Sequence, residues 1–325
     1  MSAMRGNVMK IVTITDTHIR LTTPAARTDV NWLNTILAKL RWVYSEAETA
    51  GAVAVCISGD LGDEASWSPK AIVKTQELFR EFQQRGIQTI CTIGQHDVYG
   101  HKIDEWKYTG LGILESSGVI TVLHDGQHVT LSKDGVDCVV YGFGFNEEKT
   151  LALLDGSYTV ENKKGNSLAL IHASIGAEET FGWKSVKNTK IAGIKVASFG
   201  DIHQGFEPTI LPTGTLCYST GALVRSSSAD IGRVPFMGVL EFTTAGVELE
   251  FIEVPCTKDT DAFKPEYFDN KTDTEGISDE FVAILKNIRE TTDESAKSRI
   301  ARIGKTLGYS ESVIALAVNN TEETE

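Results

Sequence analysis

The chain has 325 residues, of which 41% are hydrophobic and 23% are charged. This composition is typical of a soluble globular protein, and the length favours one large domain with an appendage. No apolar run reaches the ~18 residues of a membrane span, and residues 1–9 lack the apolar core of a signal peptide. We therefore expect a cytoplasmic protein with a disordered leader at 1–9 and no membrane association. The net charge of −13 disfavours a broadly basic nucleic-acid-binding surface, although bound divalent metals would supply local positive charge.

The five cysteines are odd in number and widely spaced, with no Cys-x-x-Cys pair. Three of them, Cys56, Cys91 and Cys138, fall inside predicted strands, where a free thiol packs as a small core residue. Free structural cysteines in a reducing compartment are therefore expected, in preference to a zinc site or a disulfide framework.

The first third of the chain alternates predicted strands with predicted helices. One helix follows a candidate cap at Asp29, and a second begins at Ser68 and Pro69 and ends near Gly86. The strands are predicted at 10–15, 53–57 and 87–93. This β-α-β-α-β order predicts parallel strands joined by helical crossovers.

Beyond residue 119 the pattern changes to many short strands, which predicts a second sheet packed on the first. These strands are expected at 119–123, 128–131, 136–141, 168–171, 196–199, 237–242 and 247–254, with a helix at 147–154. The predicted fold is thus an α/β two-sheet β-sandwich flanked by helices, formed by residues 10–255. The polar segment 256–277 is predicted as a linker, and 278–325 as a small helical C-terminal region.

Aspartate and histidine recur at the carboxyl ends of the apolar runs, where open α/β sheets place their ligands. The motifs are Asp16-Thr17-His18, Gly59-Asp60, Gly94-Gln95-His96-Asp97, His172 and Gly200-Asp201-Ile202-His203. A single Asp-x-His is commonplace, and Gly-Asp after a strand is often only a turn. The coincidence of all five motifs favours a binding site for metal ions.

The spacing within two motifs suits shared coordination of one ion. If the extended geometry of a strand continues, Asp16 and His18 lie on the same face, and Asp201 and His203 repeat this arrangement. Mixed carboxylate and imidazole ligands suit Mn²⁺, Fe²⁺ or Zn²⁺, whereas all-oxygen sites suit Mg²⁺. We interpret Asp60 as a carboxylate shared by two ions, which defines a two-metal site for phosphoryl transfer.

This ordered set of motifs resembles the calcineurin-like metallophosphoesterase superfamily over residues 10–254. The resemblance implies a metallophosphoesterase fold and two divalent metal ions, with Mn²⁺ foremost and Mg²⁺, Fe²⁺ or Zn²⁺ as alternatives. It implies one metal held by Asp16, His18, Asp60 and His203, and a second held by Asp60, Gln95, His172 and Asp201. His96 would be the general acid that protonates the leaving oxygen, with Asp97 orienting its ring.

Two positions depart from the superfamily pattern, and both belong to the second metal. Gln95 stands where the family has Asn, and Asp201 stands where it has His. An added carboxylate makes the site harder and more negative, which favours Mn²⁺ or Mg²⁺ over Zn²⁺. The alternative is that the second metal is weakly held.

Within the superfamily, the stretches 168–174, 197–204 and 218–222 are similar to the nuclease subunit of SbcCD-type DNA repair complexes, phage versions included. This resemblance implies a manganese-dependent DNA exonuclease and endonuclease in repair, recombination or phage DNA metabolism, with an SMC-like ATPase partner. The alternatives are a phosphatase or small cyclic-nucleotide phosphodiesterase, and a degenerate scaffold without catalysis. The sequence leaves open whether the protein forms a homodimer.

Substrate-binding residues are suggested by two local features. Lys184 and Lys187, with Lys190 and Lys195 nearby, could follow a phosphate backbone, although a solvated loop is the alternative. Tyr99, followed by two further aromatic residues, could stack on a base or pack in the core.

Overall fold

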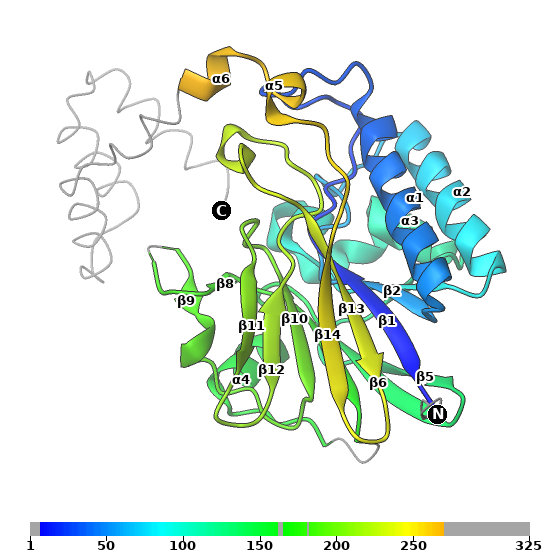
Figure 1. The fold of residues 1–325 in the computed structure, drawn as a ribbon, viewed down its shortest axis with the longest axis vertical. Coiled ribbons are helices and arrows are strands. Elements are labelled where there is room, and N and C mark those ends of the chain that lie inside the picture. The colour runs from blue at the N-terminus through cyan, green and yellow to red at the C-terminus, as the bar shows by residue number, and fades with distance from the viewer. Residues whose placement is uncertain (1–6, 162–164, 181, 270–325) are drawn as a thin grey trace, which may run out of the picture. The chain divides into compact units, whose positions relative to one another are not determined.

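The computed structural model describes residues 7–161, 165–180 and 182–269 of the chain (Figure 1). The chain divides into two compact units, Met1–Phe268 and Asp269–Glu325. Residues 1–6 of the predicted leader and the helical region predicted at 278–325 lie outside the described residues.

Two six-stranded mixed sheets form the first unit. The first has the order β14-β13-β1-β2-β3-β4 and the second the order β11-β12-β10-β7-β6-β5. In the second sheet the parallel pairs lie in the middle, with an antiparallel pair at each edge. In the first sheet the strands from β1 to β4 are parallel up to the edge, and antiparallel pairs lie on the β13–β14 side only. The first sheet contains β1 (Met9–Ile14), β2 (Ala54–Ile57), β3 (Gln88–Cys91), β4 (Thr121–Val122), β13 (Phe236–Phe242) and β14 (Val247–Glu253). The second contains β5 (His128–Lys133), β6 (Val136–Phe143), β7 (Ser167–His172), β10 (Val196–Gly200), β11 (Phe206–Ile210) and β12 (Leu216–Ser219).

The predicted two-sheet α/β sandwich is therefore confirmed, although several elements were not anticipated. The sequence did not predict β11 and β12, the small pair of β8 (Ile175–Gly176) and β9 (Lys184–Ser185), or the helix α3 (Gly110–Ser116). These elements are short and lack a sustained apolar alternation, so their structure depends on neighbours that are distant in sequence.

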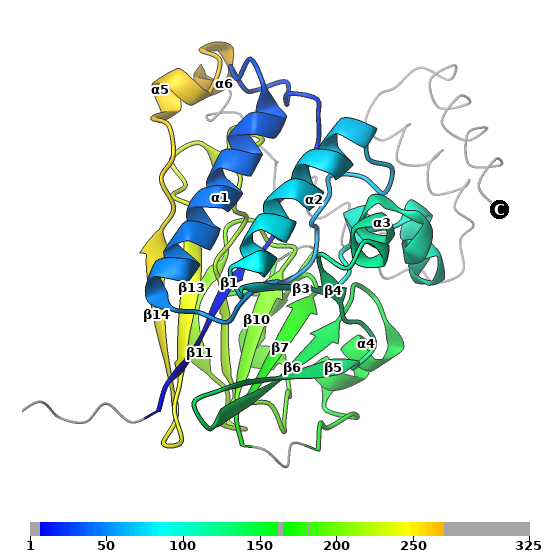
Figure 2. The ribbon, with the colours of Figure 1, turned by 90° about the vertical axis from the view of Figure 1, so that its right-hand side faces the viewer.

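Helices cover the outer face of each sheet. Helices α1 (Trp32–Ala50) and α2 (Pro69–Gln84) lie side by side across the first sheet (Figure 2), and α4 (Glu148–Asp155) packs on the second. The α2 cap was predicted correctly, since the Ser68 hydroxyl accepts the Ala71 N–H. The cap predicted for α1 was wrong. Asn31 caps this helix, whereas Asp29 accepts hydrogen bonds from Arg27 and Thr35. None of the described helices is long and apolar enough to cross a membrane.

Successive side chains along a strand point to opposite faces of the sheet, so they belong to separate hydrophobic cores. On β1, Val12 and Ile14 pack towards the helices, whereas Met9 and Ile11 pack between the sheets. The strand begins at Met9, which is fully buried and pairs with Phe242. The prediction of a disordered leader that extends to residue 9 was therefore wrong for that residue. The cysteines of β2, β3 and β6 are buried and free, as predicted.

The segment predicted as a linker at 256–277 packs on the sandwich up to residue 268. It forms α5 (Asp259–Ala262) and α6 (Glu266–Asp269), and the Asp259 carboxylate pairs with Arg225. Phe263 is fully buried with Ala26 and Ile231. Its polar composition indicated a solvated chain, but Phe263, the Asp259 ion pair and backbone hydrogen bonds such as that from Lys264 to Ala26 attach it to the sandwich.

We expect Phe263→Ala to destabilise the protein by about 3–5 kcal/mol, because it leaves a cavity in a well-packed cluster. The Arg27 guanidinium, 4.8 Å from the ring centroid, also loses its aromatic partner. Urea unfolding followed by circular dichroism measures the change. Tyr267→Ala, at a half-buried ring of the same segment, is the control and should cost clearly less. Equal losses in both variants would contradict an anchoring role for Phe263.

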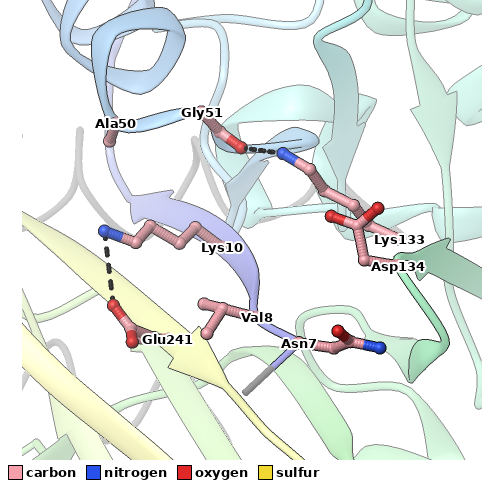
Figure 3. A pocket seen from close by; sticks show the side chains of 8 residues that line it. All are labelled: Asn7, Val8, Lys10, Ala50, Gly51, Lys133, Asp134 and Glu241. Carbon is pink, nitrogen blue, oxygen red and sulfur yellow. Dashed lines mark hydrogen bonds and ion pairs between the residues drawn. The ribbon is translucent and has the colours of Figure 1, made fainter. Parts of the chain in front are cut away.

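A cavity of ≈ 600 Å³ lies at the amino-terminal end of β1, away from the motifs that follow that strand (Figure 3). The two lysines in its lining are already engaged. Lys10 forms an ion pair with Glu241 at 3.3 Å, and the Lys133 ammonium donates to the Gly51 carbonyl at 2.6 Å. The Lys133 contact places a positive charge at the carboxyl end of α1, where it stabilises the helix.

Candidate metal centre

The polar motifs meet at one end of the sandwich, because the parallel strands of both sheets deliver their carboxyl ends there. The first sheet contributes the residues after β1, β2 and β3. The second sheet contributes the residues at the ends of β7 and β10. The residues brought together are Asp16, His18, Asp60, Gln95, His96, His172, Asp201 and His203.

The chain leaves the strand geometry before it reaches the ligands. Asp16, His18 and Asp60 all have positive φ angles, of 49°, 44° and 49°, and Asp201 has a φ of 94°. The extended continuation predicted for both Asp-x-His pairs is therefore wrong. Backbone hydrogen bonds from Thr17 and His18 to the Asp60 carbonyl hold the turn instead. Such backbone strain in non-glycine residues persists where surrounding contacts enforce it, and it is common at functional sites.

The first predicted metal set converges closely. The Nε2 atoms of His18 and His203 lie 3.0 Å apart, and Asp16 Oδ1 lies 4.0 Å from His18 Nε2. Ligand atoms of all three residues fall within 4.8 Å of one another. Burial lowers the pKa of His18, against the Asp60 and Asp16 charges that raise it, and this favours the neutral ring with a nitrogen lone pair available for a metal.

Asp60 occupies the centre of the site and is almost completely buried. Its Oδ1 accepts the backbone N–H of His96 at 2.9 Å, while Oδ2 has no hydrogen-bond partner and lies 3.4 Å from His172 Nε2. Burial alone would raise the pKa of this carboxyl, but the His172 imidazolium lowers it to about 2. Asp60 is therefore an anion in the site.

Two glycines of the motifs lie so close to neighbouring side chains that no Cβ atom would fit. A Cβ on Gly94 would lie 2.0 Å from Asp60 Oδ1, and one on Gly59 would lie 2.2 Å from His172 Nδ1. Gly59 also has a φ of 87°. A side chain at either position would displace a predicted metal ligand, which explains why glycine precedes both Asp60 and Gln95.

The two residues that depart from the family pattern contact each other. Gln95 Nε2 donates to Asp201 Oδ1 at 2.6 Å, and Gln95 Oε1 lies 2.7 Å from His172 Nε2. The backbone N–H of Asp201 also points at both carboxylate oxygens of Asp16, at 3.2 Å each. These contacts connect the residues predicted for the second metal with those predicted for the first.

These residues fit divalent metal ions. Asp60 Oδ2 is a buried, anionic oxygen without a hydrogen bond. In the metal-free site the protonated His172 ring, 3.4 Å away, balances its charge, and a bound metal ion would take over that role. The His172 Nδ1 atom donates to the Ser58 carbonyl at 2.6 Å, an outer contact of the kind that directs the opposite nitrogen of a histidine at a metal. Residues Asp16, Asp60 and His172 form a second group whose ligand atoms lie within 4.8 Å of one another.

Asp97 does not have the role expected of it. Its carboxylate accepts the backbone N–H groups of Gly62 and Gly94, both at 2.9 Å, and it thereby ties two motif loops together. The His96 ring is held by a residue that the sequence reasoning missed, since Nδ1 lies 2.9 Å from the Asp63 carbonyl. Burial, with the adjacent Asp60 charge, raises the pKa of Asp97 to about 7. The prediction that Asp97 orients His96 was therefore wrong, because the Asp63 carbonyl holds the His96 ring.

Asp63 and Arg20 form a further missed contact at the edge of the site. Arg20 donates to Asp63 Oδ2 at 2.5 Å, and Asp63 Oδ1 lies 3.6 Å from His18 Nδ1. The only available sequence signal was the second aspartate of Gly59-Asp60-Leu61-Gly62-Asp63, which the family pattern contains.

The candidate substrate residues are accessible to different degrees. Lys187 forms an ion pair with Glu178 at 2.7 Å, in which both side chains are exposed. Lys184 is exposed on β9, and Tyr99 is 43% exposed directly after the His96 motif. All three side chains are therefore exposed.

A model of the calcineurin-like phosphoesterase family matches residues 9–205, which is more than half of the chain. The protein belongs to this family and is a metal-dependent phosphoesterase, a hydrolase. The family and the converging ligand groups support two divalent metal ions as its cofactor. No curated protein matches the chain.

Two solved structures are similar at low identity. One is a conserved uncharacterized protein, a predicted phosphoesterase, from Streptococcus pneumoniae, with 11% identity, a TM-score of 0.33, and coverage of 79% of this chain and 94% of that one. The other is a dimetal phosphatase from Danio rerio, with 11% identity, a TM-score of 0.47, and coverage of 77% of this chain and 100% of that one. Identity this low says nothing about the substrate of the present protein.

We expect metal binding to release a proton from His172. Burial alone would lower the pKa of this imidazole, but the Asp60 carboxylate raises it to about 10, so the metal-free protein holds the proton at pH 7. A metal needs the neutral ring, so affinity should rise about tenfold per pH unit for each proton released below pH 10. Calorimetry of Mn²⁺ binding in buffers of different ionisation enthalpy counts the protons. Binding without proton release would contradict a protonated His172 ring in the metal-free protein.

Proposed function

We propose that the protein is a two-metal phosphodiesterase acting on DNA, of the SbcCD nuclease-subunit type. The observation that carries the hydrolytic part is the position of His96, an exposed side chain with a ring nitrogen within 4.8 Å of the ligand atoms of Asp60 and His18. The choice of DNA is supported by the motif stretches around His172, His203 and Thr220, which resemble that nuclease type.

The protein's own residues would act in two ways. As an imidazolium, His96 would donate Nδ1–H to the Asp63 carbonyl and give the proton on Nε2 to the leaving oxygen. Asp16, His18, Asp60, Gln95, His172 and His203 would hold the metal ions. When bound, these ions supply Lewis-acid activation of water and neutralise charge that develops on the phosphate.

The proposal includes an SMC-like ATPase subunit as partner. With a net charge of −13, the chain lacks the overall positive charge that long-range attraction to DNA needs. The metal ions supply positive charge only at the site, so a second, basic subunit would provide the remaining contacts along the duplex.

The test is hydrolysis of linear single- and double-stranded DNA with Mn²⁺, Mg²⁺ or EDTA, beside a small phosphodiester and a phosphomonoester. We expect Mn²⁺-dependent DNA degradation that EDTA abolishes. Rapid hydrolysis of the monoester without DNA cleavage would favour a phosphatase and overturn the substrate. Absence of turnover on every ester would favour a scaffold.

A further inference from the structure

Asp201 is placed where the family pattern has a histidine ligand, yet its carboxylate faces protein groups. Oδ1 accepts the Gln95 amide at 2.6 Å, and Oδ2 accepts the Ser174 hydroxyl at 2.5 Å. Each carboxylate oxygen thus has a short, directional hydrogen bond to a neighbouring side chain. Among the described residues, none of the three groups of converging ligand atoms includes Asp201.

These contacts determine which way the Gln95 amide points. A carboxylate can only accept, so the NH₂ group of Gln95 must face Asp201 and the amide oxygen must face the other way. That oxygen lies 2.7 Å from His172 Nε2, on the side of the buried Asp60. Glutamine has one methylene more than the asparagine of the family pattern, hence one more rotatable bond to be restrained.

We propose that Asp201 is a positioning residue that aims the Gln95 amide oxygen at the second metal, and that it is not itself a ligand. Ser174 holds Asp201 in turn, so Ser174, Asp201 and Gln95 form a chain of hydrogen bonds that ends at the metal. The two departures from the family pattern are then one coupled change. The longer amide requires an acceptor, and the aspartate supplies it.

The consequence is a second metal held by fewer protein groups than the first. Asp60, Gln95 and His172 would be its ligands, and the position of the family's histidine would be left to water or substrate. Its affinity should therefore depend on how well the Gln95 amide is held. Removing a hydrogen bond that orients a metal ligand typically lowers metal affinity about 10–100-fold.

The experiment is a double-mutant cycle on the affinity of the second Mn²⁺, measured by calorimetry on the full chain. We expect Asp201→Ala to weaken this ion by about 10–100-fold, and to have less than about a fivefold effect when Gln95 is already alanine. An undiminished Asp201→Ala effect in the Gln95→Ala background would show an independent ligand and overturn the proposal. Should Asp201→Ala fail to fold, Asp201→Asn is taken through the same cycle, with the same limit in the Gln95→Ala background.

A crystal structure with Mn²⁺ provides a readout that does not depend on affinity. The expected arrangement has Gln95 Oε1 bonded to the ion and the Asp201 carboxylate still on the Gln95 amide. A direct bond from Asp201 to Mn²⁺ would overturn the proposal. The inference rests on metal binding by this family and not on DNA as the substrate, so the nuclease assay can fail without affecting it.

Discussion

Replacing His96 by alanine should reduce phosphodiester hydrolysis by about 10²–10⁴-fold, the usual contribution of a positioned general acid. Metal binding should persist, because Asp60 Oδ1 accepts the backbone N–H of residue 96 and not its ring. The measurement is kcat/KM on DNA, with the second Mn²⁺ affinity followed in parallel.

Comparing substrates with different leaving groups tests whether His96 donates a proton. An alkoxide leaves poorly unless it is protonated, whereas an activated nitrophenolate leaves without help. The His96→Ala loss should therefore be large on DNA and much smaller on a nitrophenyl phosphodiester. His128→Ala, at an exposed histidine of β5, is the matched control and should leave both rates unchanged. Equal losses on both substrates would assign His96 to binding or to metal geometry in place of proton donation.

The sequence correctly identified the site residues that directly follow buried strands. An apolar run such as 53–57 predicts a strand, and parallel strands must bring their carboxyl ends to one edge, so Asp60 and its counterparts could be expected to meet. The glycines before Asp60 and Gln95 were part of the same pattern, and the structure gives their physical reason in the contacts that a Cβ would make.

Other contacts could not be anticipated because no local pattern encodes them. The contact of Ser174 with Asp201, and that of the Asp63 carbonyl with His96, depend on turns with positive φ and on two sheets packed together. Asp97 was assigned to His96 through the family resemblance, but its buried carboxylate accepts backbone N–H groups instead. The packing of 256–268 depends on a few residues scattered through a polar stretch, Phe263 and Asp259 among them, which composition does not reveal.

Asp60→Asn is expected to have the broadest effect on the site. In the described part of the chain, the ligand atoms of Asp60 converge with His18 in one group and with Asp16 and His172 in another, so neutralising Asp60 should weaken both predicted metal positions. Loss of activity should at least match the removal of one strong electrostatic stabiliser, about 10²–10³-fold. Metal content after dialysis should fall below that of the unaltered protein, and Asp134→Asn, at an exposed turn, should change neither quantity.

The same variant makes a prediction for the metal-free protein. Burial lowers the pKa of His172, and the Asp60 charge is the largest of the effects that raise it, with smaller ones from Asp16 and Asp201. Without that charge burial prevails, so the His172 ring should titrate at a pH far below 10, which an NMR titration of the ring protons follows. The neutral ring then has no proton to release at pH 7, and proton release on Mn²⁺ binding should diminish in step. An Asp60→Asn protein that still releases the proton would show that another group supplies it, and that His172 and Asp60 do not act as a pair.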